Sequence, residues 1–239
     1  YYDGDNSFRD HQTVMGSDMI GTVAGHSQAA GWIQPIPHHW QSALGGAWLM
    51  GYASNLPING RLSQGPSLYA WSGKVGASVE TIRWLDYPLA NPLGTYGRDP
   101  AQEGILAASN PVWNEVSEAY LGFVRGDDYI VIGKTGGLET GIGYKDSRDD
   151  GSLMHGYDTY AVDDKSNYYW VYDLKEIVAA DYAYSPRPYA YGSLDLFSPG
   201  LIVGADYHDG RLYTFSFDRD RIQNRYEDEP VVTVHEFCE

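Results

Sequence analysis

The stretch of sequence that says most about the fold is Ala119-Tyr120-Leu121-Gly122-Phe123-Val124-Arg125-Gly126-Asp127-Asp128-Tyr129-Ile130-Val131-Ile132. Its two apolar runs, 119–124 and 129–132, flank four turn-forming residues, which is the pattern of a β-hairpin. A second pair of runs, 201–207 and 211–217, flanks His208-Asp209-Gly210, where Asp-Gly is a strong turn signal. These hairpins predict an all-β chain built from antiparallel strands.

Outward from these hairpins, the same kind of aromatic or apolar strand recurs along the chain. Its members centre on Met19, Tyr69, Tyr129, Tyr169 and Tyr213. The steps between them are roughly 50, 60, 40 and 44 residues, close to the length of a four-stranded propeller blade. Residues 1–239 are therefore predicted to form one domain, a five-bladed β-propeller-like fold, with strand 231–234 closing the ring. A β-sandwich is the alternative, because turn spacing alone can produce repeats this degenerate.

Two segments are predicted to be helical. Residues 173–180 begin with the capping residue Asp173 and place their apolar residues on one face. Residues 111–120 show a weaker apolar stripe of the same period. The remaining apolar runs are short and bounded by turn residues, which is typical of strands, and in such a strand His38 and His39 would point to opposite faces.

Composition and charge narrow the range of partners. The chain has 32 acidic and 16 basic residues, a net charge of -16, which excludes the basic surface that nucleic acids require. Its apolar runs are all shorter than the roughly 18 residues of a membrane-spanning helix, so no membrane insertion is expected. The 21 tyrosines, 7 tryptophans and 28 glycines favour strands and tight turns.

Cysteine usage and the N-terminal sequence point to an exported protein. Cys238 is the only cysteine, so it can form no internal disulfide and is read as an incidental thiol or a crosslink to another chain. A near absence of cysteine suits an exported bacterial protein. The chain opens without an initiator Met or a signal-peptide pattern, so a processed or excised chain is expected. The predicted location is extracellular or at the cell surface.

Five further segments carry a resemblance to a known group of proteins. They are Trp40-Gln41-Ser42-Ala43-Leu44-Gly45-Gly46, Gln64-Gly65-Pro66-Ser67-Leu68-Tyr69-Ala70-Trp71, Tyr169-Trp170-Val171-Tyr172-Asp173-Leu174, Arg187-Pro188-Tyr189-Ala190-Tyr191 and Ile202-Val203-Gly204-Ala205-Asp206-Tyr207. With them the chain resembles exported bacterial β-propeller-like proteins of no established function, and more distantly the five-bladed glycosidase-type propellers. The resemblance implies a propeller-like fold, and it leaves open an incomplete first blade with more chain before Tyr1.

Carboxylates carry the enzymatic hypothesis. Glycosidic bond hydrolysis needs two acids roughly 5–10 Å apart, one of them able to donate a proton. A propeller brings distant strands together around its axis, so acids beside predicted strands are the candidates. Glu118 and Asp206 are the predicted catalytic pair, with Asp18 and Asp86 as further candidates. Each of these residues also has a plainer interpretation as an edge or turn acid.

Four other residues are predicted to bind a ligand. His26 follows an apolar strand and is placed to project from a loop into a central site. The planar fork of Arg187 suits a uronate or sulfate, its alternative being a salt bridge between blades. Tyr189 and Tyr207 supply rings on which sugars stack and hydroxyls that form hydrogen bonds. About two thirds of all the aromatic rings are nevertheless expected to fill the core, since packed interiors are rich in them.

No cofactor or metal site is predicted, and calcium is the only cation with a candidate loop. In residues 146–151 oxygen-bearing side chains precede a glycine, as calcium requires, but Arg148 and Tyr157 occupy positions where ligands should stand. A solvated acidic turn is the preferred interpretation. The same loop leaves calcium as an alternative.

Three functions follow from these features. The first is a carbohydrate- or polymer-binding propeller whose partner is an extracellular polysaccharide or surface polymer. The second is a glycoside hydrolase with an Asp/Glu pair near the propeller axis. The third is a structural subunit that assembles with other protein chains at a surface.

Overall fold

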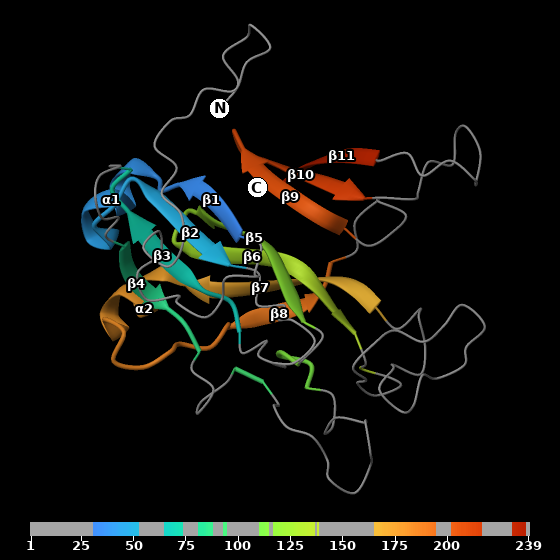
Figure 1. Cartoon of the computed structure of the whole chain (residues 1–239), viewed down its shortest axis with the longest axis horizontal. Coiled ribbons are helices and arrows are strands. Elements are labelled where there is room, and N and C mark those ends of the chain that lie inside the picture. The colour runs from blue at the N-terminus through green and yellow to red at the C-terminus, as the bar shows by residue number, and fades with distance from the viewer. Residues whose placement is uncertain are drawn as a thin grey trace, which may run out of the picture.

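The structure is a computed structural model, and it describes residues 31–52, 65–73, 81–87, 93–94, 110–114, 117–136, 138, 165–194, 202–216 and 231–237. The described residues form eleven strands and two short helices. The strands lie in three antiparallel sheets, none of which closes on itself (Figure 1). The prediction of an all-β chain is confirmed.

Each sheet contains strands that follow one another in the chain. The first sheet has the order β1-β2-β3-β4, the second β5-β6-β7-β8 and the third β11-β10-β9. Their bounds are β1 Gly31–Pro35, β2 Trp48–Tyr52, β3 Leu68–Trp71, β4 Thr81–Leu85, β5 Glu118–Arg125, β6 Asp128–Gly136, β7 Lys165–Asp173, β8 Ala190–Ser193, β9 Ile202–His208, β10 Arg211–Ser216 and β11 Val231–Glu236. Figure 1 shows that β1, β5 and β9, the first strand of each sheet, lie near the centre of the molecule.

Both predicted hairpins are present. β5 and β6 pair from Glu118–Lys134 to Arg125–Asp128 around a two-residue turn. β9 and β10 meet at His208 and Arg211, and the turn residues Asp209 and Gly210 have φ angles of 49° and 76°. Two successive positive φ angles give the turn a twist that matches the twist of the strands. Asp-Gly therefore specifies this hairpin through its backbone conformation.

The second sheet packs between the other two. Cross-strand partners share a face, so Gly122 and Tyr129 lie on one face of this sheet and Phe123 lies on the other. On the first face the Tyr129 hydroxyl donates to the carbonyl of Ser67, 2.6 Å away, next to β3. On the opposite face Phe123 stacks on Tyr207 of β9, with ring centroids 4.1 Å apart. The second sheet is therefore covered on both faces by sheets.

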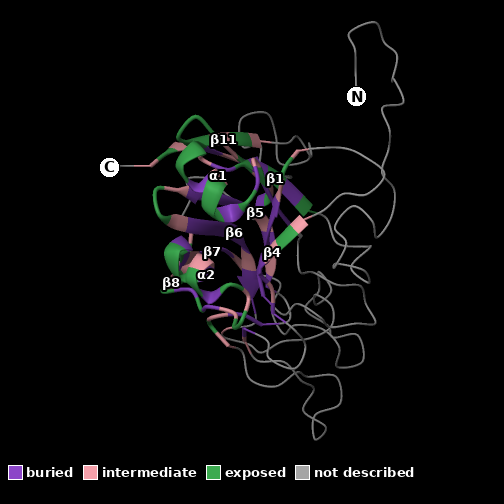
Figure 2. Ribbon diagram, turned by 90° about the vertical axis from the view of Figure 1, so that its left-hand side faces the viewer, coloured by how far each residue is buried: buried purple, intermediate pink, exposed green. Residues whose placement is uncertain are grey.

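Burial on both faces explains the continuous apolar run in β6. Tyr129, Ile130, Val131 and Ile132 are all at most 9% exposed, as expected for a strand with no solvent face. Figure 2 shows the buried residues gathered along β5, β6 and β7, whereas α1 (His38–Leu44) and β11 carry exposed residues. Three sheets with a covered middle sheet do not match the alternative prediction of a two-sheet sandwich.

The recurring aromatic strands do not mark one sheet each. Tyr129 lies on β6 and Tyr169 on β7, and these strands are neighbours, with Tyr169 opposite Ile132. Tyr69 and Tyr213 lie on β3 and β10, and Met19 is outside the described residues. Two of the five predicted repeat units are thus adjacent strands of one sheet, because aromatic residues occur on several strands of a sheet and not once in each. The predicted closing strand, β11, pairs with β10 and extends the third sheet.

One helix was predicted correctly, one wrongly and one was missed. α2 (Leu174–Ala180) begins where the Asp173 side chain accepts a hydrogen bond from Lys175 N at 2.8 Å. The predicted helix over 111–120 is wrong, since its last three residues belong to β5. The missed helix is α1, which contains His38 and His39 and buries Trp40 and Leu44, one helical turn apart. Neither helix has the length and apolar character needed to span a membrane.

Candidate functional site between three sheets

The first strands of the three sheets enclose a cavity of about 410 Å³ that is partly open to solvent. β1 lines it with residues 31–34, β5 with residues 118–121 and β9 with residues 203–206. Among the described residues each of these strands pairs on one side only, so each is the edge of its sheet. A strand edge carries main-chain N–H and C=O groups outside the sheet's ladder. The cavity therefore combines side chains from three strands with three strand edges.

Two β-bulges occur at this cavity. The pairing of β5 with β6 passes from Ala119 to Leu121 and leaves Tyr120 without an opposite residue. In the pairing of β9 with β10, Val203 is the extra residue. A bulge redirects a side chain and takes its backbone groups out of the ladder, and bulges are frequent beside binding and active sites. Both extra residues line the cavity.

Glu118 is held by two neighbours on the second sheet. Lys134 Nζ lies 2.8 Å from Glu118 Oε2, because the register places these residues opposite each other. The Tyr120 hydroxyl donates to the same oxygen at 3.4 Å, and the Lys134 ammonium lies 5.4 Å from the centre of the Tyr120 ring. The three side chains form one cluster of a carboxylate, an ammonium and a phenol.

The protonation states of this cluster follow from burial and charge. Burial raises the pKa of Tyr120 to about 12, so the phenol stays neutral. Burial alone would lower the pKa of Lys134, but Tyr120 and Glu118 outweigh it and raise that pKa to about 12. Lys134 is therefore a cation throughout the physiological pH range, and it forms an ion pair with Glu118.

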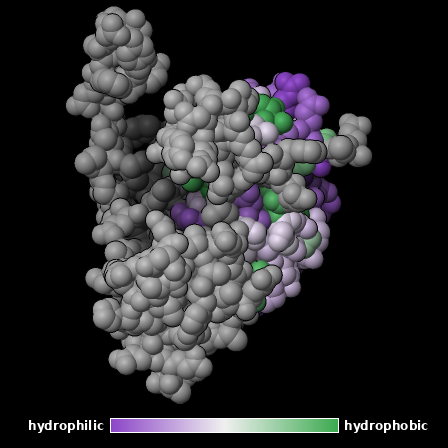
Figure 3. Space-filling view, turned by 90° about the vertical axis from the view of Figure 1, so that its right-hand side faces the viewer, coloured by the Kyte–Doolittle hydropathy of each residue, from purple (hydrophilic) through white to green (hydrophobic). Residues whose placement is uncertain are grey.

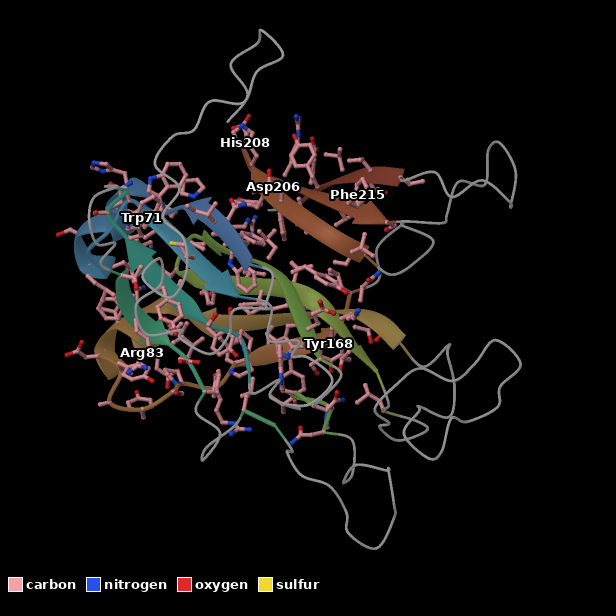
Figure 4. All side chains as sticks on the ribbon, in the orientation of Figure 1. Trp71, Arg83, Tyr168, Asp206, His208 and Phe215 are labelled. Carbon is pink, nitrogen blue, oxygen red and sulfur yellow. The ribbon has the colours of Figure 1, made fainter. Side chains whose placement is uncertain are left out.

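Asp206 lies across the cavity on β9 and belongs to a different sheet from Glu118 (Figure 4). Its Oδ1 accepts a hydrogen bond from Nε2 of Gln34, a residue of β1 that is only 5% exposed. This bond connects the first and third sheets directly. Asp206 itself is exposed, and it forms no ion pair with any described residue.

The two predicted catalytic acids thus line one cavity, although 88 positions separate them in the chain (206 minus 118). Around them the cavity offers an amide from Gln34, the Tyr120 ring and the strand edges. Hydroxyl-rich ligands need acceptors and donors arranged in this way around a few rings. The arrangement suits binding of a polar ligand, and the roles of both acids remain predictions.

Tyr207 does not face this cavity. Its ring stacks on Phe123 and contacts the edge of Phe237, with centroids 4.1 and 5.9 Å away. Neighbouring residues of a strand point to opposite faces, so the exposure of Asp206 directs Tyr207 into the core. Its ring also lines a smaller cavity of about 160 Å³ next to Pro35 and His208.

Arg187 and Tyr189 lie elsewhere, near α2 and β8. Arg187 donates through Nη2 to the carbonyl of Leu93 at 2.6 Å and forms no ion pair with a described residue, while its role as an anion clamp stays a prediction. The Tyr189 side chain is 62% exposed and its hydroxyl donates to Asp128 at 2.8 Å. Neither residue lines the cavity between β1, β5 and β9.

The remaining candidates are structural or lie outside the description. Asp86 accepts hydrogen bonds from the Tyr69 hydroxyl and from Tyr87 N, as expected for a structural acid at the end of a strand. His26, Asp18, the loop 146–151 and Cys238 lie outside the described residues. Within the described ranges, no three His, Cys, Asp or Glu residues come together as metal ligands would.

Sequence reasoning missed several cavity residues and their neighbours. Trp32 and Gln34 share one face of β1, and Tyr120 follows Glu118 by two positions. Residues two positions apart in a strand lie on one face, and this spacing could have identified them. Lys134 was not among the residues predicted from the sequence. Its pairing with Glu118 depends on the register of β5 and β6, and this register cannot be read from the sequence.

Comparisons with protein-family models, with curated proteins and with solved structures found no match for this chain.

Proposed function

We propose that this chain is an extracellular or cell-surface carbohydrate- or polymer-binding protein, and that its ligand enters the cavity between β1, β5 and β9. The observation that carries the proposal is the convergence of Glu118, Asp206, Gln34 and Tyr120 from three sheets on one cavity. Its volume of about 410 Å³ is in the range of small-molecule sites. A short saccharide or the end of a polysaccharide fits this size better than a fully enclosed polymer.

The three sheets are proposed to be blades of the predicted five-bladed, propeller-like ring. Each is an antiparallel run of consecutive strands, and the first strand of each lies at the shared cavity. Blades of a propeller have this order around a central channel. An experimental structure of the whole chain tests this proposal, and sheets that do not surround a common axis would refute it.

The binding proposal is tested by titrating the protein with a panel of soluble oligosaccharides in a calorimeter. Saturable binding is expected for at least one saccharide, and Asp206→Asn should weaken it at least several-fold, because a hydrogen bond to a charged acceptor is lost. Asp209→Asn is the matched control, since it removes the same charge from the exposed turn after β9. Equal weakening by both substitutions would show that the cavity is not the site.

A glycoside hydrolase is the second candidate, because the two predicted acids line the same cavity. Hydrolysis would need one of these acids to donate a proton and the other to act as base or nucleophile. Sugar release from a polysaccharide panel, abolished by Glu118→Gln and by Asp206→Asn, is the expected result. Release that both variants retain would remove this assignment.

A further inference from the structure

The charges around the cavity are not balanced. Glu118 is compensated by Lys134 at 2.8 Å, whereas among the described residues Asp206 is contacted by the neutral amide of Gln34 and by no cation. The described residues that line the cavity include no cationic side chain. One uncompensated carboxylate therefore faces it, within a chain whose net charge is -16. A field of this sign attracts cations and repels uronates and sulfates.

The cluster at Glu118, beside the cavity, shows which groups of this protein contact an ammonium. Lys134 Nζ contacts a carboxylate oxygen and lies 5.4 Å from the centre of an aromatic ring. Carboxylate contact and ring contact are the two interactions that favour a partly desolvated ammonium. Because Lys134 already occupies Glu118, the carboxylate left for an ammonium from outside is Asp206.

The bulged strand edges add a second kind of recognition. Tyr120 and Val203 are both out of their ladders, so main-chain donors and acceptors of β5 and β9 lie at the cavity in addition to the side chains. Groups of this kind bind the hydroxyls of a sugar ring, and an aliphatic amine has no hydroxyls to offer them. A ligand that uses both features carries an ammonium and several hydroxyls on one ring.

We infer that the cavity selects amino sugars with a free ammonium group, and that Asp206 is the residue that binds the ammonium. This inference rests on the proposed carbohydrate-binding function and specifies its ligand class. The third sheet then supplies the charge selectivity of the site, while the second sheet supplies a fixed wall whose own charges are already paired.

The test compares three soluble disaccharides by calorimetry at about pH 6, where a sugar amine is protonated, and at about pH 9, where it is mostly neutral. They are the disaccharide of glucosamine, its N-acetylated form and a disaccharide that contains glucuronate. At the lower pH the glucosamine disaccharide is expected to bind about tenfold more tightly than the acetylated one. The preference should disappear at the higher pH and in Asp206→Asn, and persist in the control Asp209→Asn.

The outcomes separate the inference from the function on which it rests. If the acetylated and free disaccharides bind equally, or Asp206→Asn keeps the preference, the inference is wrong and carbohydrate binding stands. If spermidine, an amine without hydroxyls, binds as tightly as the amino sugar, the site recognises charge alone and the inference is also wrong. If no saccharide binds, the proposed function itself fails.

Discussion

The second and third sheets of this protein use similar strand sequences in different surroundings. In β5 and β6 most residues are buried and none is exposed, whereas β11 alternates between half-buried and exposed residues, and Val232 and Val234 are 60% and 50% exposed. Figure 3 views the molecule from the right-hand side of Figure 1 and shows hydrophilic and apolar side chains side by side on the described surface there. A valine-rich strand is therefore a core strand only where other elements cover both of its faces.

This difference divides the candidate site into two unlike walls. Glu118 belongs to the covered sheet, where Lys134 and Tyr120 fix it, and its side chain is 15% exposed. Asp206 belongs to the exposed sheet and is held by one hydrogen bond from Gln34. The acid of the second sheet is therefore fixed in an ion pair, whereas the acid of the third sheet is exposed.

The largest expected effect is the loss of a buried aromatic side chain from the second sheet. Trp170 on β7 is fully buried, packs 4.6 Å from Trp113 and donates to the Val112 carbonyl. Trp170→Ala should lower the free energy of unfolding by about 3–5 kcal/mol, measured by urea denaturation. Tyr213→Ala, on the middle strand of the third sheet, should cost less than half as much. Equal costs would remove the distinction between the sheets.

A pair of glycines tests the same distinction by adding one methyl group. A Cβ at Gly122 on β5 would overlap the Tyr129 hydroxyl and the Trp32 ring, so Gly122→Ala should destabilise by about 1–3 kcal/mol. At Gly204 on β9 the nearest atom would be 4.0 Å away. Gly204→Ala should raise stability by about 0.5 kcal/mol, because alanine loses less entropy in a strand. Thermal denaturation that ranks the two variants the other way would contradict the packing described for β5.

Two ion pairs, one in the second sheet and one in the third, are expected to differ less in their effect on the free energy of unfolding. Glu118→Gln leaves the half-buried Lys134 without its counter-charge and should cost about 1–2 kcal/mol in urea denaturation. The pair of Arg211 and Glu236 joins β10 to β11 in solvent, with side chains 50% and 72% exposed. Glu236→Gln should cause no measurable change. A measurable loss in Glu236→Gln alone would show that the third sheet depends on its surface charges.

The smallest expected effect is a sensitivity to acid that originates in the third sheet. Burial lowers the pKa of His235 on β11 below its ordinary value of 6.5, and its Nε2 lies 3.3 Å from Thr214 Oγ1. The unfolded chain then binds the proton more readily, so this contribution to stability is present above about pH 6.5 and is lost as the pH falls below it. His235→Gln should reduce the fall in Tm between pH 8 and pH 5. His208 is an exposed histidine on β9, and His208→Gln serves as the control. An equal reduction in this variant would show that the fall in Tm does not originate at His235.

Much of the secondary structure could be read from local patterns. The hairpin of β5 and β6, the Asp-Gly turn after β9 and the Asp173 cap of α2 depend on residues next to one another. α1 was missed because its apolar face has only two buried residues, Trp40 and Leu44, which is too short a stripe to distinguish it from a strand.

The candidate site was predicted in part. Glu118 and Asp206 were chosen because they flank predicted strands, and the structure places both at one cavity. Tyr207 was chosen on the same reasoning and points into the core, since side-chain direction depends on which face of β9 is covered. Gln34 bonds Asp206 from 172 positions away, a separation at which no local pattern indicates contact.

By itself, the sequence determined that this chain is built from strands, where most of them lie and which turns join neighbours, because turn conformation and the two-residue period of a strand are local properties. The tertiary structure decided that β6 and β7 share one sheet, that this sheet is covered on both faces and that Lys134 neutralises Glu118. These features depend on strand register and on packing between segments far apart in the chain. Such contacts form only when the sheets come together, and among the described residues they leave Asp206 with a hydrogen bond from Gln34 and no ion pair.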